Sequence, residues 1–168
     1  MSRCSVSGQA PTNGEEAPVP NSATRPDGQH VDHWIMCPGE IIKAGFKRPV
    51  RTSYVHVGPP GPEYPLRDLT AEECALHNPE DNGDPYVKFE VYPEERKPIT
   101  GRFWTQADLD AVGKGCGVVT SMPLPIAETY AANPGYYGST FCCGCGAYLP
   151  VGGQGGFVWT GTVDRVGT

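Results

Sequence analysis

The sequence predicts a small α+β protein that is rich in β-strands and stabilised by a zinc site. Glycine contributes 22 residues and proline 18 of the 168, a composition that favours turns and loops over long helices. Hydrophobic residues make up 38% and aromatic residues 10%, which is enough for a modest core. The segment Phe141–Gly146 contains a C-x-x-C pair followed by glycine, a pattern typical of a zinc knuckle.

The chain divides into an N-terminal arm and one domain. Residues 1–30 predict an arm that is either flexible or docked, because prolines lie among small polar residues and large apolar residues are nearly absent. The predicted domain covers residues 31–168, a length that suits a single β-rich unit.

The first elements of the domain follow from short apolar patterns. His33–Cys37 is apolar and ends at a Pro-Gly turn. Ser53–Val57 alternates as a strand, with Tyr54 and His56 on one face. The glycine- and proline-rich segment 58–62 ends this regular structure.

Capping residues and periodicity predict the later elements. Thr70 precedes Glu73 by three residues, the spacing of a helix capping box, and Thr105 precedes Asp108 in the same way. We expect helices at residues 69–77, 105–112 and 125–132 and a strand at residues 87–92. Strands at 147–151 and 157–163, joined by the glycine turn 152–156, predict a C-terminal hairpin.

The knuckle supplies half of a tetrahedral zinc site. The Cys142 and Cys145 thiolates can face one ion, because two residues separate them on a tight turn. The other half is open, and its candidates are Cys116, Cys37, His33, Cys74 and His77. We expect Cys116 together with either Cys37 or His33. Cys4 is expected to be a free thiol in the arm, and Cys143 to pack or to face solvent.

Patterns for several enzyme classes do not occur in the sequence. His33 is not followed by the x-Glu of a zinc deaminase, and neither the H-E-x-x-H pattern nor a phosphate-binding loop is present. A redox C-x-x-C begins a helix, whereas this one precedes a strand-like run. The sequence therefore favours a protein that is not an enzyme, with zinc in a structural role.

A basic cluster offers a possible ligand site. Lys43, Lys47, Arg48 and Arg51 could hold a phosphate, and Tyr137 and Trp159 could supply stacking surfaces for a small ligand. The alternative is a solvated strand edge. The net charge of −6 argues against a general duplex-DNA binder, so nucleic acid is not an expected partner.

The C-terminal third resembles small proteins encoded by bacteriophages. The resemblance lies in four segments, which are 126–130 (IAETY), 134–142 (PGYYGSTFC), 149–151 (LPV) and 157–159 (FVW). It implies a phage origin and a zinc knuckle, and it carries no catalytic residue. A weaker resemblance is to β-tent zinc folds such as the cereblon thalidomide-binding domain, although a first C-x-x-C pair is missing here.

These observations predict a non-enzymatic interaction protein of phage type that binds a host or phage protein. The alternatives are a small-ligand or nucleotide-binding counter-defence protein and a virion decoration component. No apolar run reaches the length of a membrane span, and the sequence begins without an apolar signal region. We expect the host cytoplasm as its location, with the virion as the alternative.

Overall fold

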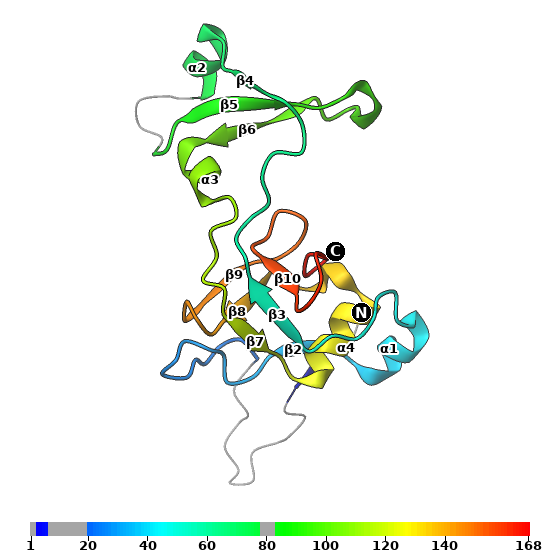
Figure 1. Ribbon diagram of the computed structural model, residues 1–168. Coiled ribbons are helices and arrows are strands. Elements are labelled where there is room, and N and C mark those ends of the chain that lie inside the picture. The colour runs from blue at the N-terminus through cyan, green and yellow to red at the C-terminus, as the bar shows by residue number, and fades with distance from the viewer. Residues whose placement is uncertain (1–2, 7–19, 78–82) are drawn as a thin grey trace. The chain divides into compact units, whose positions relative to one another are not determined.

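The computed structural model describes residues 3–6, 20–77 and 83–168, and it divides the chain into two compact units (Figure 1). The first unit combines Met1–Val57 with Gly115–Thr168, and the second, Gly58–Lys114, is inserted between them. The described residues form four α-helices and ten short strands, all paired antiparallel. The predicted α+β fold class is confirmed, whereas the boundaries at residues 30 and 31 stay a prediction.

The first unit contains three small sheets and two α-helices. The sheets have the orders β1-β2, β10-β3-β7 and β8-β9. Their strands are β1 (Arg3–Ser5), β2 (Trp34–Met36), β3 (Ser53–His56), β7 (Val119–Ser121), β8 (Ser139–Cys142), β9 (Ala147–Pro150) and β10 (Phe157–Trp159). The helices are α1 (Pro38–Ala44) and α4 (Leu124–Ala132), and a 3₁₀ turn, η2, follows at Pro134–Tyr136.

The described parts of the predicted arm pack against their own chain. Strand β1 pairs with β2, and Cys4 forms a disulfide with Cys37. The Val31 N–H donates to the Ala23 carbonyl at 2.8 Å, which folds the segment after residue 20 back on itself. The prediction that Cys4 is a free thiol is wrong, because pairing of β1 with β2 places it beside Cys37. Residues 7–19 of the arm lie outside the described residues.

The C-terminal strands pair differently from the prediction. Strand β9 pairs with β8 through the knuckle, and β10 pairs with β3, so the predicted hairpin between 147–151 and 157–163 is wrong. The glycine turn is present, since the Gly155 N–H donates to the Gly152 carbonyl. The strands on either side of this turn, β9 and β10, belong to different sheets.

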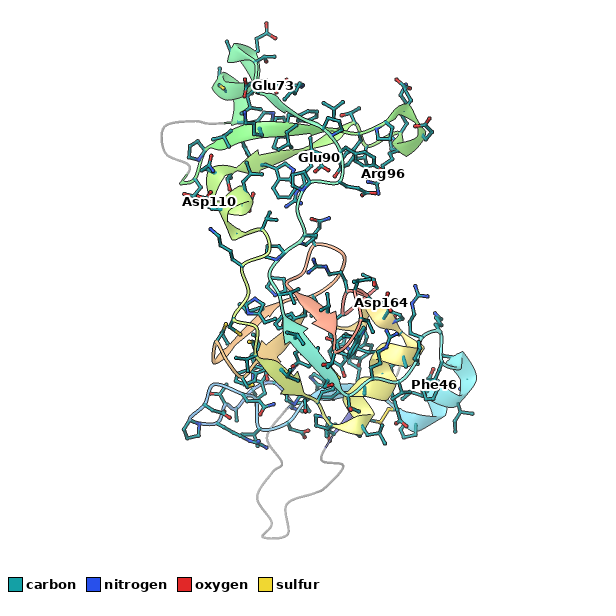
Figure 2. The ribbon with its side chains drawn as sticks, viewed as in Figure 1. Phe46, Glu73, Glu90, Arg96, Asp110 and Asp164 are labelled. Atoms are coloured by element: carbon teal, nitrogen blue, oxygen red, sulfur yellow. A yellow bond between two sulfur atoms is a disulfide. The ribbon has the colours of Figure 1, made fainter. Side chains whose placement is uncertain are left out.

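The inserted unit is a three-stranded sheet of order β4-β5-β6 with short helices at its ends. Its elements are β4 (Leu66–Asp68), α2 (Ala71–His77), β5 (Tyr86–Val91), the 3₁₀ turn η1 (Glu94–Arg96), β6 (Gly101–Thr105) and α3 (Gln106–Ala111). The capping box of Thr105 and Asp108 is confirmed. Glu90 on β5 is buried (labelled in Figure 2), and the Trp104 indole N–H donates to its carboxylate at 2.8 Å.

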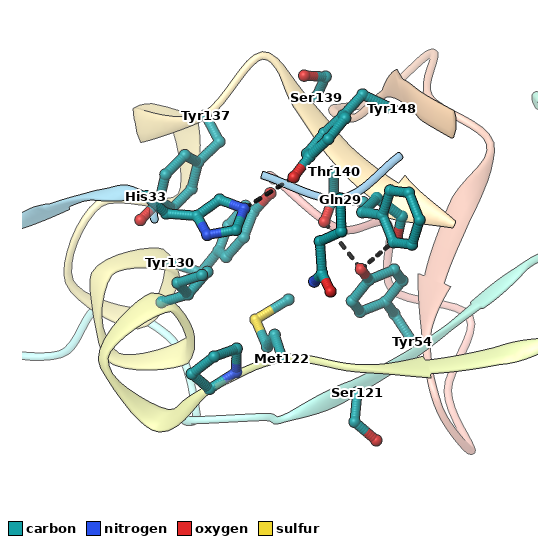
Figure 3. A pocket seen from close by; sticks show the side chains of 13 residues that line it. Gln29, His33, Tyr54, Ser121, Met122, Tyr130, Tyr137, Ser139, Thr140 and Tyr148 are labelled. Atoms are coloured by element: carbon teal, nitrogen blue, oxygen red, sulfur yellow. Dashed lines mark hydrogen bonds between the residues drawn. The ribbon is translucent and has the colours of Figure 1, made fainter. Parts of the chain in front are cut away.

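Two buried side chains of the first unit, Tyr54 on β3 and Thr129 on α4, have hydrogen-bonded hydroxyl groups. The Tyr54 hydroxyl donates to the Phe141 carbonyl and accepts from the Thr140 hydroxyl (Figure 3). The Thr129 hydroxyl donates to the Pro125 carbonyl and accepts from the Met36 N–H. Buried polar groups destabilise a fold unless they are paired in this way. The bonds of Tyr54 connect β3 to β8, and the bond from Met36 to Thr129 connects β2 to α4.

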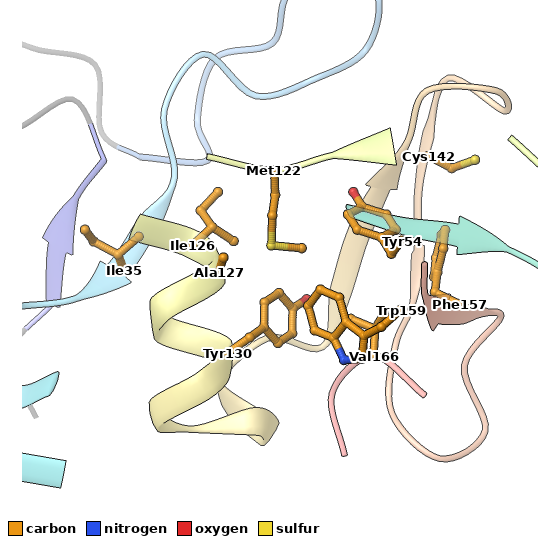
Figure 4. Packing of buried hydrophobic residues seen from close by; sticks show 10 residues of the cluster. All are labelled: Ile35, Tyr54, Met122, Ile126, Ala127, Tyr130, Cys142, Phe157, Trp159 and Val166. Atoms are coloured by element: carbon orange, nitrogen blue, oxygen red, sulfur yellow. The ribbon is translucent and has the colours of Figure 1, made fainter. Parts of the chain in front are cut away.

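Aromatic side chains dominate the core of the first unit. Tyr54, Phe157 and Trp159 meet edge to face, with Tyr130 of α4 against Trp159 (Figure 4). Cys142 belongs to the same buried cluster, although it ends β8 at the knuckle. The core therefore reaches directly to the cysteine cluster and supports it.

Candidate metal centre

Four side chains of the first unit bring their ligand atoms together. They are the imidazole Nδ1 of His56 and the sulfurs of Cys116, Cys142 and Cys145, and all four atoms lie within 4.8 Å of one another. Cys142 is buried, His56 is half-buried, and the other two are exposed. Three sulfurs and one imidazole form a donor set that could hold a metal ion.

The hairpin of β8 and β9 positions two of these ligands. Cys142 ends β8 and pairs with Ala147, which leaves the four-residue loop 143–146 between the strands. The Gly146 N–H donates to the Cys142 carbonyl at 2.8 Å, and Gly146 has a φ of 64°. Glycine adopts this left-handed conformation without strain, so the turn can close with Cys145 near Cys142.

The other two ligands flank the inserted unit in the sequence. His56 ends β3 just before the insertion, and Cys116 follows it just after. The Gly117 N–H donates to the His56 carbonyl at 2.9 Å, which holds the two chain segments side by side. A Cβ atom at Gly144 would lie 2.7 Å from the Cys116 sulfur, so the knuckle glycine makes room for this ligand.

The spacing of the ligand atoms fits a tetrahedral zinc ion. With Zn–S bonds of about 2.3 Å and Zn–N bonds of about 2.05 Å, tetrahedral edges measure about 3.8 Å for S–S and about 3.6 Å for S–N. The sulfurs of Cys116 and Cys142 are 3.4 Å apart. The His56 Nδ1 lies 3.8 Å from the Cys142 sulfur and 3.4 Å from the Cys145 sulfur. These three edges match the expected geometry to within about 0.4 Å.

Hydrogen bonds, neighbouring sulfurs and burial shift the pKa values of the cluster. A hydrogen bond from the Val118 backbone lowers the pKa of Cys116. The neighbouring Cys142 sulfur raises the pKa of Cys145 to about 11, and burial adds to the effect. Burial lowers the pKa of His56, which favours the neutral imidazole that ligates metals. A bound divalent cation would offset the repulsion that otherwise keeps Cys145 protonated.

Three of the five predicted metal ligands lie in the cluster, namely Cys116, Cys142 and Cys145. The prediction of Cys37 is wrong, because its sulfur is bonded to Cys4. His33 lies elsewhere, with its Nε2 hydrogen-bonded to the Tyr148 hydroxyl at 2.8 Å. Cys37 and His33 flank strand β2 and do not share a helix face.

The remaining candidates lie outside the cluster. Cys74 is exposed on α2, and His77 packs its ring against Phe103 in the inserted unit. Cys143, inside the knuckle, turns away from the ligands toward β7, where its sulfur contacts the Thr120 hydroxyl and the Val119 carbonyl.

His56 is the ligand that sequence reasoning missed. The sequence predicts its strand, yet His56 is absent from the candidate ligands that spacing suggests. The available signal was its position, because His56 directly precedes the glycine-proline segment that begins the insertion. A histidine at the end of a strand, followed by a break in regular structure, resembles the setting of Cys142 at the end of β8.

The predicted basic and aromatic ligand set is divided in space. Arg48, Arg51 and Trp159 line one hollow of about 290 Å³, whereas Tyr137 lines another. The Arg51 guanidinium pairs with Asp164 at 3.1 Å, and the Arg48 Nε donates to the Thr168 carbonyl. Lys43 pairs with Glu40 on α1. Three of the four predicted cations thus have protein partners, and none of the four lies on a strand.

No protein-family model, curated protein or solved structure matches this chain. Across the residues that the structure describes, no helix is both long enough and apolar enough to cross a membrane. The cysteine and histidine cluster is therefore the basis for a functional proposal.

Proposed function

We propose that this chain is a structural zinc protein that acts by binding another protein and not by catalysis. The observation that carries the proposal is the number of protein ligands: three cysteines and one histidine complete a tetrahedral shell. Catalytic zinc sites keep one position for water or substrate, whereas structural sites use four protein ligands. Zinc bound here would cross-link β3, the segment after the insertion and the β8–β9 hairpin.

The proposed partner is a host or phage protein. The resemblance of the C-terminal third to phage-encoded proteins motivates this choice. The inserted unit adds exposed apolar side chains to the argument, since Val91 and Ile99 line a hollow of about 360 Å³ and are 42% and 61% exposed. Exposed apolar groups gathered in this way favour an interface. The host cytoplasm is the proposed place of action.

Metal analysis tests the first half of the proposal. The full chain, purified without chelators, should contain close to one zinc ion, and cobalt substitution should give the visible spectrum of a tetrahedral thiolate site. Cys145→Ser should lose the metal, and Cys143→Ser should retain it. Protein that is folded but metal-free, or that loses zinc in Cys143→Ser, would contradict the assignment.

Capture and rebinding test the second half. Tagged full chain should retain a specific protein from infected bacterial cells, and that protein, once purified, should bind with fixed stoichiometry. The double variant V91E/I99E should weaken binding while keeping its zinc. Turnover of a substrate by the purified chain, or failure of any captured protein to rebind, would contradict an interaction role.

A virion component is the second candidate, and the Cys4–Cys37 disulfide favours it. Disulfides persist on virion surfaces but are rare in the reducing cytosol. Mass spectrometry of purified particles should then find the chain at a fixed copy number with this disulfide intact. Its absence from particles, together with reduced Cys4 and Cys37 in cytosolic protein, would return the assignment to the cytoplasm.

A further inference from the structure

A second hollow of the first unit, of about 210 Å³, is lined by none of the metal ligands. Its lining combines arm residues with residues of β2, of the segment after α4 and of β9, among them Arg3, His30, Trp34, Tyr136 and Tyr148. None of its lining residues is aspartate or glutamate, although the whole chain is acidic. The charged side chain that lines this hollow, Arg3, is therefore positive, whereas the net charge of the chain is negative.

Two polar atoms at this hollow are buried without a hydrogen-bond partner. They are the His30 Nδ1 and the Tyr136 hydroxyl. An unpaired buried polar atom is costly and rare in folded proteins, so two of them lining one hollow indicate that something in the hollow completes their bonds. Water can do so when no ligand is bound, and a ligand with matching acceptors would displace it.

A smaller cavity adjoins the hollow and repeats the pattern. It measures about 30 Å³, enough for one or two water molecules. It shares four lining residues with the hollow, and Figure 3 labels all of them: His33, Tyr137, Ser139 and Tyr148. Tyr130 lines it and has a buried hydroxyl without a partner. All three unpartnered buried side-chain atoms found among the described residues thus lie at these two adjoining spaces.

The walls of the hollow are fixed by their own hydrogen bonds. The Tyr148 hydroxyl accepts from the His30 N–H at 2.9 Å and bonds the His33 Nε2 at 2.8 Å. The His30 ring stacks on Tyr148 with centroids 4.3 Å apart. The Tyr137 hydroxyl donates to the Trp34 carbonyl at 2.8 Å. A ligand would meet walls that are already positioned, which lowers the entropic cost of binding.

The charge at the hollow selects the ligand class. Burial raises the pKa of Tyr136, and the positive charge of Arg3 opposes that rise. The electrostatic field of the guanidinium therefore reaches the unpartnered hydroxyl. Arginine binds carboxylate and phosphate through a fork of N–H donors. Two further aromatic residues, Trp34 and Tyr137, also line the hollow.

We propose that this hollow binds a small organic anion. Its carboxylate or phosphate group contacts Arg3, the Tyr136 hydroxyl and the His30 Nδ1, and its flat apolar body lies against the aromatic walls. None of the metal ligands lines this hollow, and all of its lining residues belong to the first unit.

Three probes of matched size test the proposal on the full, zinc-loaded chain: benzoate, phenyl phosphate and the neutral benzamide. NMR titration should give a dissociation constant near the millimolar range for at least one anion, with benzamide at least tenfold weaker. The tighter of the two anions identifies the head group. Equal binding of benzamide, or no binding of any probe at about 10 mM, would overturn the proposal.

Variants separate binding from folding. Tyr136→Phe should weaken the tighter anion roughly tenfold, and Arg3→Gln at least as much. Because the Tyr136 hydroxyl has no protein partner, Tyr136→Phe should leave the thermal midpoint unchanged or raise it. Tyr64→Phe, a control in the inserted unit, should change neither quantity. Unchanged affinity in Tyr136→Phe would show that the hydroxyl does not contact the anion. A lowered midpoint would show that the hydroxyl has a structural role.

Discussion

The two units of this chain are stabilised by different physical means. The first unit has a buried aromatic cluster, the Cys4–Cys37 disulfide and the cysteine and histidine cluster that could hold a metal ion. Among the described residues of the inserted unit, Glu90 and Trp104 are the only buried residues other than glycine. Its sheet is covered by arginines over aromatic rings, such as Arg67 over Phe89 at 4.4 Å and Arg102 over Trp104 at 3.8 Å.

This difference shows where single changes should matter. A cross-link or a buried aromatic residue holds several elements at once, so its loss is felt throughout a unit. Cation–π contacts and exposed ion pairs each contribute little and leave their neighbours intact. Single substitutions at a few positions should therefore unfold the first unit. Single substitutions in the inserted unit should each lower its stability only slightly, except at Glu90.

Metal removal should have the largest effect. Structural zinc in small domains contributes on the order of 10 kcal/mol, which is comparable to the whole stability of a typical domain. A chelator, or Cys142→Ser, should therefore unfold the first unit. The three indole N–H signals in an NMR spectrum report this, because Trp34 and Trp159 lie in the first unit and Trp104 in the second.

The expected pattern is loss of dispersion at Trp34 and Trp159 with retention at Trp104. Cys143→Ser is the matched control, since its sulfur contacts Thr120 and not the cluster. Unchanged spectra after complete zinc removal would mean that the aromatic core alone holds the unit.

The disulfide should rank second. Its residues are 33 apart, and closing a loop of that length restricts the unfolded chain by about 4 kcal/mol in the entropic description. The double variant C4S/C37S should lose that much stability in urea unfolding while its zinc content stays the same. Loss of zinc in this variant would restore Cys37 as a metal ligand.

Sequence reasoning found the parts of the site that are local. Cys142 and Cys145 sit on one turn, so their spacing alone predicts a shared ligand. The capping box of Thr105 and the helix over 125–132 are also local, and the structure places them at Gln106–Ala111 and Leu124–Ala132.

The errors all concern pairing between distant segments. Cys4 meets Cys37 only because β1 pairs with β2, and His56 meets the knuckle only because the insertion leaves and returns at one place. The sequence pattern would allow β10 to pair with β9, but β10 pairs instead with β3, at the edge of β3 that β7 does not occupy. Such choices depend on which side chains pack together, which spacing and composition do not encode locally.

Glu90 should be the exception within the inserted unit. Its carboxylate accepts from the backbone N–H groups of Glu63 and Tyr64 at 2.6 and 2.9 Å and from the Trp104 indole. Glu90→Gln keeps the shape but turns an N–H₂ group toward a donor, which should cost about 2–3 kcal/mol. Urea unfolding followed at Trp104 measures this. A loss below about 0.5 kcal/mol would show that the bonds contribute little.

Zinc affinity should depend on pH. A Cys145 thiol with its pKa raised to about 11 keeps its proton at neutral pH in metal-free protein, so zinc must displace that proton. Affinity should therefore fall as pH falls, roughly tenfold per pH unit for each proton released. Competition with a chromophoric chelator between about pH 6 and 8 measures the slope. A zinc affinity that does not change with pH would exclude thiolate ligation.

Arg102 should show the smallest effect and complete the comparison. Its guanidinium lies 3.8 Å from the Trp104 ring centroid, and a partly exposed cation–π contact contributes about 0.5–1 kcal/mol. Arg102→Ala should lose that amount in urea unfolding. Arg102→Met keeps the aliphatic cover over the ring, so it should recover the part due to packing and not the part due to charge. A loss above about 3 kcal/mol in Arg102→Ala would place this residue with the cross-links and buried groups, and the inserted unit would then depend on a few positions as the first unit does.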